Sequence, residues 1–529
     1  MRVVIIGGGS AGISAATHLR RQDENVEIII LEKSNEFAIS SCGLPYLIDG
    51  KIKDKDEIIG ASVEQMRNLF KIDVRLNTEV LSIKQDKKLL KLSPNGKLIY
   101  DYLILATGAI QLRPDISGVL SENIFTLNNL YSTQRIINYF YKLDAKNVIV
   151  LGGGFIGIRV AEALLNNGAK VTLIEKSNQI LNEFDYDFAQ MIKHKLKAKG
   201  LDILTSTIIK EFQEDKIILS NSEKLKYDMA IISVGTTNEL KLPIMTNIDI
   251  GMTGGIAVDQ HMKTSVDGIW ACGENLELTD LVSELPIRPK NASLIVRSAK
   301  VAADNVLGIQ SSMSKVLRNQ IVKAFDYVFG VTGCNEDELN RAGIPYYKLY
   351  FSQLNAETYI DTSKNINCKL LFGLDGKILG FQIFGNIGVN SRLNIVAAMI
   401  QQNANVQHLA EFTNAYFPEF SRAKDILNNM GTLAIEMTFE RMKTITLEDL
   451  KENDVLLNVC KPDKFKHFTK AKAINIPLSS LRDNLTSLPL NKKIVVTCGN
   501  GYAAYMAYCI LKQRGFDKVF LLNSPETWQ

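Results

Sequence analysis

The sequence predicts an α/β protein of several domains, and three observations lead to this prediction. A buried strand, a glycine turn and a helix follow one another at the N-terminus, and the same unit recurs near residue 150. From about residue 314 onward the pattern changes to mixed strands and helices. A length of 529 residues is enough for roughly two to four domains.

The first unit reads RVVIIGGGSAGISAATHLRR and is followed by a second strand, VEIIILEKS. Its turn carries Gly7, Gly9 and Gly12 in the spacing G-x-G-x-x-G. In this spacing the first glycine permits the tight turn, the second lets a pyrophosphate approach, and the third lets helix and strand pack closely. The helix N-terminus attracts phosphate, and Glu32 at the end of the second strand can accept hydrogen bonds from a ribose. The unit therefore predicts a dinucleotide site.

The second unit reads NVIVLGGGFIGIRVAEALLNNGAKVTLIEKS. It carries Gly152, Gly154 and Gly157 in the same spacing, and Glu175 closes the next strand. A single motif of this kind can be purely structural, but two copies with a terminal acid each indicate two dinucleotide sites. Two such sites in one chain suggest that electrons pass between two cofactors.

Three further segments end a strand in a glycine turn. YDYLILATGA contains Thr107 and Gly108, YDMAIISVGTT follows the second unit, and DGIWACGENLEL contains Gly273 and Glu274. Such turns can return the chain to the first domain. The predicted fold class is thus α/β with two interleaved Rossmann-like dinucleotide-binding domains, one formed by residues 1–115 plus 250–315 and the other by residues 116–249.

The C-terminal half is expected to contain two more domains. Residues 316–436 form an α+β domain, with strands in KAFDYVFGVTG and KLLFGLDGKILGFQIFG and a helix in RLNIVAAMIQQ. Residues 436–446 are interpreted as a short connector. Residues 446–529 form a small α/β unit with strands in VLLNV, KAINIPL, KKIVVT and KVFLLN.

The composition gives no support to two classes of function. Lys and Arg total 61 and Asp and Glu total 57, a net charge of +4, which does not favour binding to nucleic acid or to an anionic membrane. No apolar run is long enough to span a bilayer, and Met1 is followed at once by a strand rather than a signal sequence. We therefore expect a cytoplasmic protein.

The seven cysteines are scattered along the chain, without a CxxC pair or a His/Cys cluster. This distribution predicts neither a disulfide scaffold nor a metal site. One cysteine, Cys42, stands in the segment SSCGLPY, about thirty residues after the first glycine turn.

These motifs together carry a family resemblance. The two glycine units, the SSCGLPY segment, ATGA and TGGIAVD resemble the pyridine nucleotide–disulfide oxidoreductases. A single cysteine before GLPY is similar to the branch that contains coenzyme A-disulfide reductases and NADH oxidases and peroxidases. AYFPEFSRAKDILNNMG resembles that branch's dimerisation domain, and the tail resembles a rhodanese. The whole layout resembles reductase–rhodanese fusions, including NADH-dependent persulfide reductases, which act on coenzyme A disulfides, persulfides or polysulfides.

The resemblance implies cofactors and an assembly. FAD is expected in the first site, with contacts from its glycines, Glu32 and Lys33, from Thr107 and Gly108, and from Gly273 and Glu274. NADH is expected in the second site, and NADPH remains possible. The carboxylate of Glu175 favours NADH, because it suits a free 2′-hydroxyl and repels a 2′-phosphate. A homodimer is expected, because residues 316–436 resemble a dimerisation domain.

Cys42 is predicted to be the reactive group. In this position a thiol can be held as a thiolate, although a buried structural cysteine is the alternative. The next cysteine in the sequence is Cys272, so Cys42 must exchange with a sulfur of the substrate. NADH would reduce FAD, and the reduced flavin would reduce a mixed disulfide or persulfide on Cys42.

Two rival functions remain open. In the oxidase and peroxidase relatives the cysteine cycles through a sulfenic acid, and those relatives carry a histidine where this chain has Ser10. This difference favours the reductase. Other departures leave room for a non-catalytic flavin-binding redox sensor: Arg159 and Glu274 stand where relatives carry a glutamate and an aspartate, and Asn390 and Asn394 where acids are common.

The resemblance also implies substrate-binding residues. Ser14, His18 and Arg21 share one helical face by their spacing and match positions that offer polar groups to coenzyme A, and Ser41 precedes the cysteine. His18 and Arg21 can equally be solvated surface residues. Tyr359 and Tyr416 match tyrosines that reach the partner subunit's cysteine and could donate a proton to a leaving thiolate, but each can also be a packed interface aromatic.

In the tail, Cys498 follows a strand and precedes a helix. The backbone amides of CGNGYA and the helix N-terminus can stabilise a thiolate or persulfide there, and resemblance to rhodanese makes Cys498 the sulfur carrier. The chain departs from the rhodanese pattern, because Asn458-Val459-Cys460 replaces Asp-Val-Arg and Tyr502 replaces an arginine. We therefore expect the tail to bind a persulfide without being an efficient thiosulfate sulfurtransferase.

Overall fold

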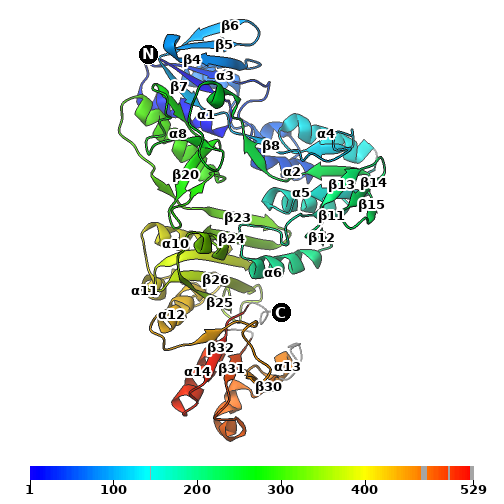
Figure 1. The fold of residues 1–529 in the computed structure, drawn as a ribbon, viewed down its shortest axis with the longest axis vertical. Helices are drawn as coiled ribbons and strands as arrows, with labels where there is room; N and C mark the ends of the chain where they lie inside the picture. The colour runs from blue at the N-terminus through cyan, green and yellow to red at the C-terminus, as the bar shows by residue number, and fades with distance from the viewer. Residues whose placement is uncertain (143, 466–472, 499–500, 525–529) are drawn as a thin grey trace. The chain divides into compact units, whose positions relative to one another are not determined.

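The computed structural model describes residues 1–142, 144–465, 473–498 and 501–524 (Figure 1). These residues form two compact units. The first unit joins Met1–Asn182 to Lys193–Val316, and the second joins Glu183–Ile192 to the described residues from Leu317 onward.

A five-stranded parallel sheet in the first unit carries the first glycine turn. Its strand order is β19-β7-β1-β2-β3. Helices α1 (Ser10–Gln22) and α8 (Ala292–Val306) pack against each other beside it. The strands are β1 (Arg2–Ile6), β2 (Glu27–Leu31), β3 (Asp73–Arg75), β7 (Tyr102–Leu105) and β19 (Ile269–Ala271). The pairing of Leu103 in β7 with Ile269 in β19 shows that the segment DGIWACG returns the chain to this sheet, as predicted.

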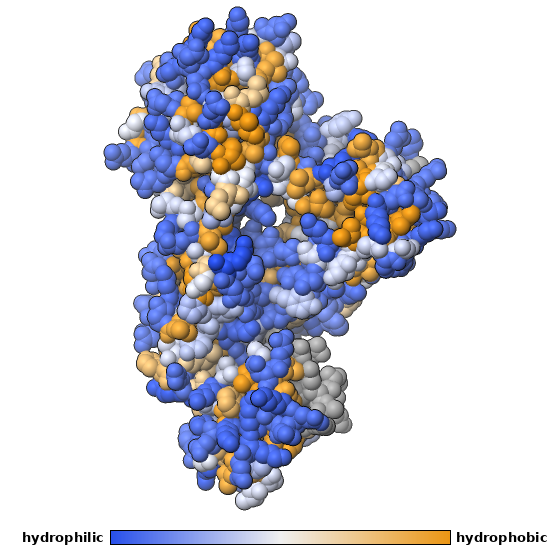
Figure 2. Space-filling view, viewed as in Figure 1, coloured by the Kyte–Doolittle hydropathy of each residue, from blue (hydrophilic) through white to orange (hydrophobic). Residues whose placement is uncertain are grey.

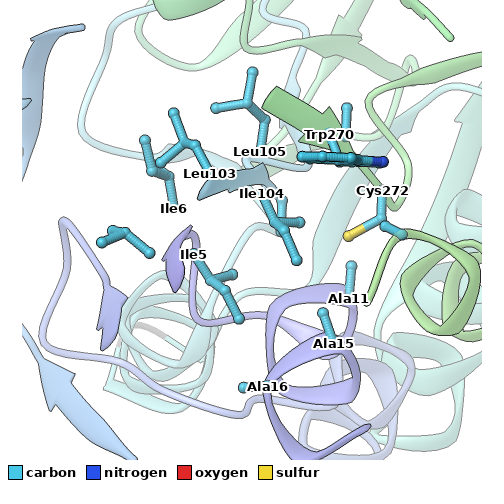
Figure 3. Close-up of a cluster of buried hydrophobic side chains, with 14 of the residues drawn as sticks. Ile5, Ile6, Ala11, Ala15, Ala16, Leu103, Ile104, Leu105, Trp270 and Cys272 are labelled. Atoms are coloured by element: carbon cyan, nitrogen blue, oxygen red, sulfur yellow. The ribbon is translucent and has the colours of Figure 1, made fainter. Parts of the chain in front are cut away.

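Small residues on α1 explain how the helix approaches the sheet. Ala11, Ala15 and Ala16 are buried against the apolar strand residues, as Figure 3 shows. Cys272 lies in the same core and is fully buried. The strands are apolar at nearly every position because both faces of a parallel sheet are covered.

A second parallel sheet carries the second glycine turn, in the order β12-β11-β10-β16-β9. Its elements are β9 (Ile124–Thr126), β10 (Asn147–Leu151), β11 (Lys170–Ile174), β12 (Asp202–Leu204) and β16 (Met229–Ile232), with helices α4 (Leu130–Lys142) and α5 (Phe155–Asn166). Strands β8 (Ala109–Gln111) and β17 (Thr236–Asn238), one before and one after this sheet in sequence, pair with each other.

Smaller elements complete the first unit. They are β4 (Val80–Lys84), β5 (Leu89–Leu92), β6 (Gly96–Ile99), β13 (Ile209–Phe212), β14 (Lys216–Leu219), β15 (Lys224–Lys226), β18 (Ile256–Ala257), β20 (Leu276–Asp280), β21 (Pro286–Ile287), β22 (Lys315–Val316), α2 (Leu44–Ile48), α3 (Val63–Phe70) and α7 (Lys241–Met245). Strands β4, β5 and β6 form one antiparallel sheet, and β13, β14 and β15 form another.

The second unit is built first on an antiparallel sheet in the order β23-β24-β27-β26-β25. Helix α10 packs on β24 and β27, and α12 contacts β25. The elements are β23 (Asn319–Ala324), β24 (Tyr327–Gly333), β25 (Tyr346–Leu354), β26 (Asn365–Gly373), β27 (Ile378–Gly385), α6 (Tyr186–Lys197), α9 (Glu336–Arg341), α10 (Val389–Gln401), α11 (Val406–Glu411) and α12 (Ile426–Thr438). Helix α6 begins in the segment that the second unit takes from the middle of the chain.

The C-terminal part forms a five-stranded parallel sheet in the order β28-β32-β31-β29-β30. Its elements are β28 (Thr444–Ile445), β29 (Val455–Asn458), β30 (Ile474–Asn475), β31 (Ile494–Thr497), β32 (Val519–Leu522), α13 (Pro462–Phe465) and α14 (Gly501–Gln513). The expected connector 436–446 is shorter than predicted: α12 runs to Thr438 and residues 444–445 pair with β32. The difference arises because the backbone of 443–445 completes the sheet edge, accepting hydrogen bonds from Leu521 N and Asn523 N.

This C-terminal sheet is bonded to strand β25. The Asn523 side chain accepts a hydrogen bond from Tyr350 N at 2.9 Å and donates one to Lys348 O at 2.6 Å. A Cβ on Gly501, the first residue of α14, would lie 2.7 Å from the Phe351 ring. A glycine there lets the helix begin directly against β25.

Hydrophilic side chains dominate the face drawn in Figure 2, with hydrophobic ones in scattered groups. Within the described part of the chain, every helix is too short or too polar to cross a lipid bilayer.

Candidate functional site

The first glycine turn, between β1 and α1, is closely packed at two glycines and open at the third. Gly7 has a φ of +115°, and a Cβ on it would lie 2.2 Å from Ala106 O. A Cβ on Gly12 would lie 1.9 Å from Gly7 O. At Gly9, no atom of the described residues lies within 4 Å of the Cβ position. The turn therefore leaves space at the N-terminus of α1, where a pyrophosphate can be held.

The second glycine turn, between β10 and α5, repeats this geometry. Gly152 has a φ of +114° and would bring a Cβ within 2.2 Å of Ser233 O. A Cβ on Gly157 would lie 2.0 Å from Gly152 O, whereas the Cβ position of Gly154 has no described atom within 4 Å. The residues present thus fit a dinucleotide at each turn.

The acid at the end of each second strand is held beside its glycine turn. Glu32 Oε2 accepts a hydrogen bond from Gly8 N at 2.8 Å, and Glu175 Oε2 accepts one from Gly153 N at 2.8 Å. Each carboxylate is positioned by the turn itself, next to the space left by the central glycine. From this position a carboxylate can accept hydrogen bonds from the hydroxyl groups of a ribose.

The turn after β19 lies against α1. Gly273 has a φ of +102°, a Cβ on it would lie 2.9 Å from the Ala11 Cβ, and its N–H donates to Ser298 Oγ at 3.0 Å. The next residue, Glu274, is half-buried and accepts a hydrogen bond from Thr236 Oγ1 at 3.4 Å. Its contact with a flavin stays a prediction.

The turn after β7, at Thr107 and Gly108, is hydrogen-bonded to the turn after β19. Asn275 Nδ2 donates to Thr107 Oγ1 at 3.2 Å, and Asn275 Oδ1 is a buried acceptor without a hydrogen-bond partner among the described residues. Gly108 has a φ of +65° and open space at its Cβ position within the described structure. Lys33 is exposed, and its Nζ lies 3.5 Å from Glu239 Oε2. The orphaned amide oxygen and the open turn fit a bound group, although the individual contacts remain predictions.

Cys42 is exposed on the short helical turn Ser41–Gly43, which leads directly into α2. Gly43 is buried, and a Cβ on it would lie 2.4 Å from an Ile58 methyl. Four residues before the cysteine, Ala38 N donates to Gly8 O at 3.1 Å. The segment is therefore fastened to the first glycine turn while its sulfur faces solvent, as a reactive thiol requires.

Cys272 is not suited to act as a second redox cysteine. It is fully buried, and burial raises the pKa of its thiol to about 12, so it stays protonated at neutral pH. All seven cysteines lie in the described residues, and Cys42 is the exposed one.

Arg159 has a structural role beside the Cys42 segment. It lies on α5, which packs against α2, and its guanidinium carbon lies 4.8 Å from the centre of the Tyr46 ring. Arg159 also forms a salt bridge with Glu162 on the same helix. The Arg159 cation is thus paired with a carboxylate and stacked on a ring of the helix that follows Cys42.

The three polar residues on α1 do not share an exposed face. His18 is buried, and its Nε2 lies 2.5 Å from Asp304 Oδ1 on α8, which also binds Lys300 Nζ at 2.6 Å. Ser14 is half-buried and Arg21 is exposed. The imidazole is drawn into the helix–helix contact by a carboxylate that the sequence spacing did not reveal. Substrate binding by His18, Ser14, Arg21 and the exposed Ser41 stays a prediction.

Tyr359 and Tyr416 lie together in the second unit. Both side chains are exposed, and their hydrogen bond raises the pKa of Tyr416. Two more exposed aromatics follow, Phe417 and Phe420, with ring centres 5.8 Å apart. Approach of the tyrosines to a partner subunit's cysteine stays a prediction.

The tail holds a feature that the sequence analysis missed. Cys498 follows β31 and Cys460 follows β29, and their sulfurs lie 3.0 Å apart. The sequence does contain a sign of this proximity, since each cysteine comes just after a predicted strand of one small sheet. The expected backbone nest in CGNGYA includes residues 499 and 500, which lie outside the described residues, and Tyr502 has Lys424 Nζ 5.5 Å from its ring centre.

One acidic cluster has the geometry of a metal site but contains a lysine. Oxygens of Asp185, Asp187 and Glu336 lie close together, and Lys369 Nζ is 2.7 Å from Asp185 Oδ2, 3.1 Å from Asp187 Oδ1 and bonded to Glu336. Lys369 is fully buried. The ammonium occupies the place of a cation, and the cluster is a buried ion-pair network.

Comparison with known proteins extends over the whole chain. The solved structures of reduced Bacillus anthracis CoADR-RHD (30% identity, TM-score 0.96) and of a NAD-dependent persulfide reductase from A. fulgidus (29% identity, TM-score 0.95) each match 100% of this chain, over 97% and 100% of their own. Two curated relatives match about four-fifths of it. They are an NADH oxidase of Methanocaldococcus jannaschii (29% identity, 81% of this chain and 97% of the relative) and a coenzyme A disulfide reductase of Staphylococcus haemolyticus (26% identity, 82% and 100%).

Two family patterns match the chain itself. Residues 320–426 match the pyridine nucleotide-disulphide oxidoreductase dimerisation domain, and residues 1–302 match the main pattern of that family. The second match covers more than half of the chain and includes both glycine turns and Cys42. The chain therefore belongs to the pyridine nucleotide-disulphide oxidoreductases, enzymes that use FAD and NAD(P)H.

Proposed function

We propose that this enzyme uses electrons from NADH to reduce sulfur–sulfur bonds of small molecules at Cys42. The observation that carries the proposal is the contrast between two cysteines in one unit: Cys42 is exposed and fastened to the first glycine turn, whereas Cys272 is a fully buried thiol. With no accessible second thiol there, the substrate must supply the second sulfur.

The chemistry at Cys42 follows from this arrangement. The Cys42 thiolate attacks one sulfur of R–S–S–R′, forms Cys42–S–S–R and releases R′S⁻. FAD held at the first turn and NADH held at the second would supply the electron pair that, with one proton, returns Cys42 to the thiolate and releases RSH. Hydrogen bonds from the glycine turns hold Glu32 and Glu175 ready for the two riboses.

The substrate is proposed to be a coenzyme A disulfide, a coenzyme A persulfide or a polysulfide. The name of the Staphylococcus haemolyticus relative supports the coenzyme A disulfide, and that of the A. fulgidus relative supports a persulfide. The exposed Arg21 and Ser41 are the residues we expect to contact the substrate, and Glu175 favours NADH over NADPH.

We also propose a homodimer and a rhodanese-like tail. The match of residues 320–426 to the dimerisation domain supports the first, and the exposed Tyr359, Tyr416, Phe417 and Phe420 offer an aromatic surface for a partner. The proposed domains are residues 1–115 plus 250–315 for FAD, 116–249 for NADH, 316–436 for dimerisation and 446–529 for sulfur handling by Cys498.

A second candidate function is an NADH oxidase or peroxidase. The name of the Methanocaldococcus jannaschii relative favours it, and an exposed thiolate can form a sulfenic acid. Ser10, in place of the histidine of the peroxidases, favours the reductase. Membership in an enzyme family does not favour the third possibility, a non-catalytic redox sensor.

One anaerobic stopped-flow experiment separates these functions. The flavin of the purified protein should bleach on mixing with NADH and reoxidise with coenzyme A disulfide or persulfide. Cys42→Ser should keep the bleaching and lose the reoxidation, whereas Cys509→Ser, a cysteine of α14, should behave as wild type. Full disulfide turnover by Cys42→Ser would contradict the proposal. Continued NADH consumption when oxygen or peroxide is the only acceptor added to the reduced enzyme would support the oxidase.

A further inference from the structure

The ends of two neighbouring parallel strands bring two cysteines together in the tail. Strands β29 and β31 pair in register from Val455 with Ile494 to Asn458 with Thr497. Cys498 comes one residue after this last pair and Cys460 two residues after it. Because neighbouring strands lie about 4.8 Å apart, residues just past the same sheet edge fall within the Cα spacing that a disulfide needs.

We propose that Cys460 and Cys498 form a second redox-active site, in which Cys460 reduces a persulfide carried by Cys498. The site would take persulfides of low-molecular-weight thiols and release hydrogen sulfide without NADH. The inference rests on the proposed sulfur-carrying role of Cys498 but is independent of the chemistry at Cys42.

The distance between the sulfurs suits this reaction. The two Sγ atoms lie 3.0 Å apart. A disulfide has an S–S length of about 2.05 Å, so the sulfurs need to approach by roughly 1 Å, which side-chain rotation can supply. Both residues are half-buried, so a small molecule can reach them.

The backbone around Cys460 is held in place by side chains. Cys460 N donates to Asn458 Oδ1 at 2.9 Å, and Asn475 Nδ2 donates to Cys460 O at 3.0 Å. Asn475 also donates to Asn458 O at 3.1 Å and so ties β30 to the same turn. These bonds fix the position of Cys460 relative to the sheet edge and so keep its sulfur close to that of Cys498.

Two groups near Cys498 favour sulfur anions there. Helix α14, with 13 residues, begins at Gly501 and directs its N-terminus to the same edge of the sheet. Thr497 is 1% exposed, and its Oγ1 has no hydrogen-bond partner among the described residues. This buried hydroxyl, in the residue that precedes Cys498, is a hydrogen-bond donor whose capacity is unused within the described part of the chain.

The reaction balances with the two thiols as the reductant. The Cys498 thiolate attacks the outer sulfur of R–S–SH and forms Cys498–S–SH while RS⁻ leaves. The Cys460 thiolate then attacks the Cys498 sulfur, forms the Cys460–Cys498 disulfide and expels HS⁻. In sum, one persulfide and two thiols become one thiol, one disulfide and one hydrogen sulfide. Two equivalents of a low-molecular-weight thiol then reduce the disulfide and leave as their own disulfide.

The test uses the full-length protein carrying Cys42→Ser, which removes the cysteine proposed to receive electrons from the flavin. This variant is mixed with glutathione persulfide without NADH, quenched with an alkylating agent and digested without reduction. Released sulfide is counted, and peptide mass spectrometry follows both cysteines. We expect about one equivalent of sulfide per chain and a peptide linked through Cys460 and Cys498.

The companion variants separate the two cysteines. Cys42→Ser/Cys460→Ser should lose the sulfide burst and retain one extra sulfur on Cys498, whereas Cys42→Ser/Cys509→Ser should behave like the parent. Diamide should link Cys460 to Cys498 in the parent, which tests their proximity without any persulfide. An undiminished sulfide burst after Cys460→Ser would overturn the proposal, and so would a persistent Cys498 persulfide in the parent. Failure of NADH-driven turnover alone would instead count against the role of Cys42.

Discussion

Replacing Gly154 with alanine should weaken NADH binding while leaving the fold and the FAD content unchanged. Gly154 is the N-cap of α5 and has a φ of −79° and a ψ of −178°, which alanine adopts readily. A Cβ there meets no described atom within 4 Å, so the methyl group enters the space reserved for the pyrophosphate.

Gly154→Ala should have a small effect on the free energy of unfolding and a larger one on the Kd for NADH. Alanine is a poorer N-cap than most residues, but it also restricts the unfolded chain, which is worth about 0.4–1 kcal/mol in the opposite direction. The free energy of unfolding should therefore change by less than about 1 kcal/mol. An extra methyl group in a filled site costs about 1–3 kcal/mol, which corresponds to a roughly 5- to 150-fold rise in Kd for NADH.

The assay is a titration with NADH of protein whose FAD content and Tm have been measured. Gly157→Ala is the contrasting variant, because its Cβ would lie 2.0 Å from Gly152 O and should lower Tm as well. Gly9→Ala is the mirror variant and should lower FAD content rather than NADH affinity. NADH binding of wild-type strength by Gly154→Ala would refute the assignment of the second turn to NADH.

Two further predictions concern the ion-pair network of the second unit. Lys369→Met leaves the carboxylates of Asp185, Asp187 and Glu336 without their shared ammonium, and we expect the free energy of unfolding, measured with denaturant, to fall by about 3–5 kcal/mol. Substitution of the exposed Lys364 by Met should change it by less than about 0.5 kcal/mol. An equal loss in both variants would contradict a special role for the buried ammonium of Lys369. Burial would raise the pKa of Glu336, but the ammonium groups of Lys369 and Lys348 overcome this and lower it to about 2. Since the folded pKa lies below the ordinary value, the Glu336 carboxylate stabilises the fold above about pH 4.5 and loses this contribution as the pH falls towards 2. Glu336→Gln should therefore flatten the pH dependence of stability across this range, and a profile parallel to that of wild type would show that Glu336 contributes nothing.

The features that depend on neighbouring residues could be predicted from the sequence. Each glycine turn is specified within about six residues, because the requirement for a positive φ at Gly7 and for close packing at Gly12 is local. The strand and helix on either side follow from their hydrophobic pattern, and the structure forms the same turn again at residues 152–157. Cys42 was recognised because it stands within a short motif.

The features that join distant segments could not be predicted in this way. His18 is buried because Asp304, 286 residues later, faces it from α8, and helical spacing contains no information about that partner. Arg159 stacks on Tyr46 because α2 and α5 pack together.

The proximity of Cys460 and Cys498 combines a feature that is local in the sequence with one that depends on the fold. The position of each cysteine just after a strand is evident from the sequence, since apolar runs precede both. Their pairing as neighbouring strands becomes visible in the folded sheet alone, since pairing between strands far apart in sequence is set by the packing of the whole sheet. Two sulfurs 38 residues apart thereby come within 3.0 Å of each other.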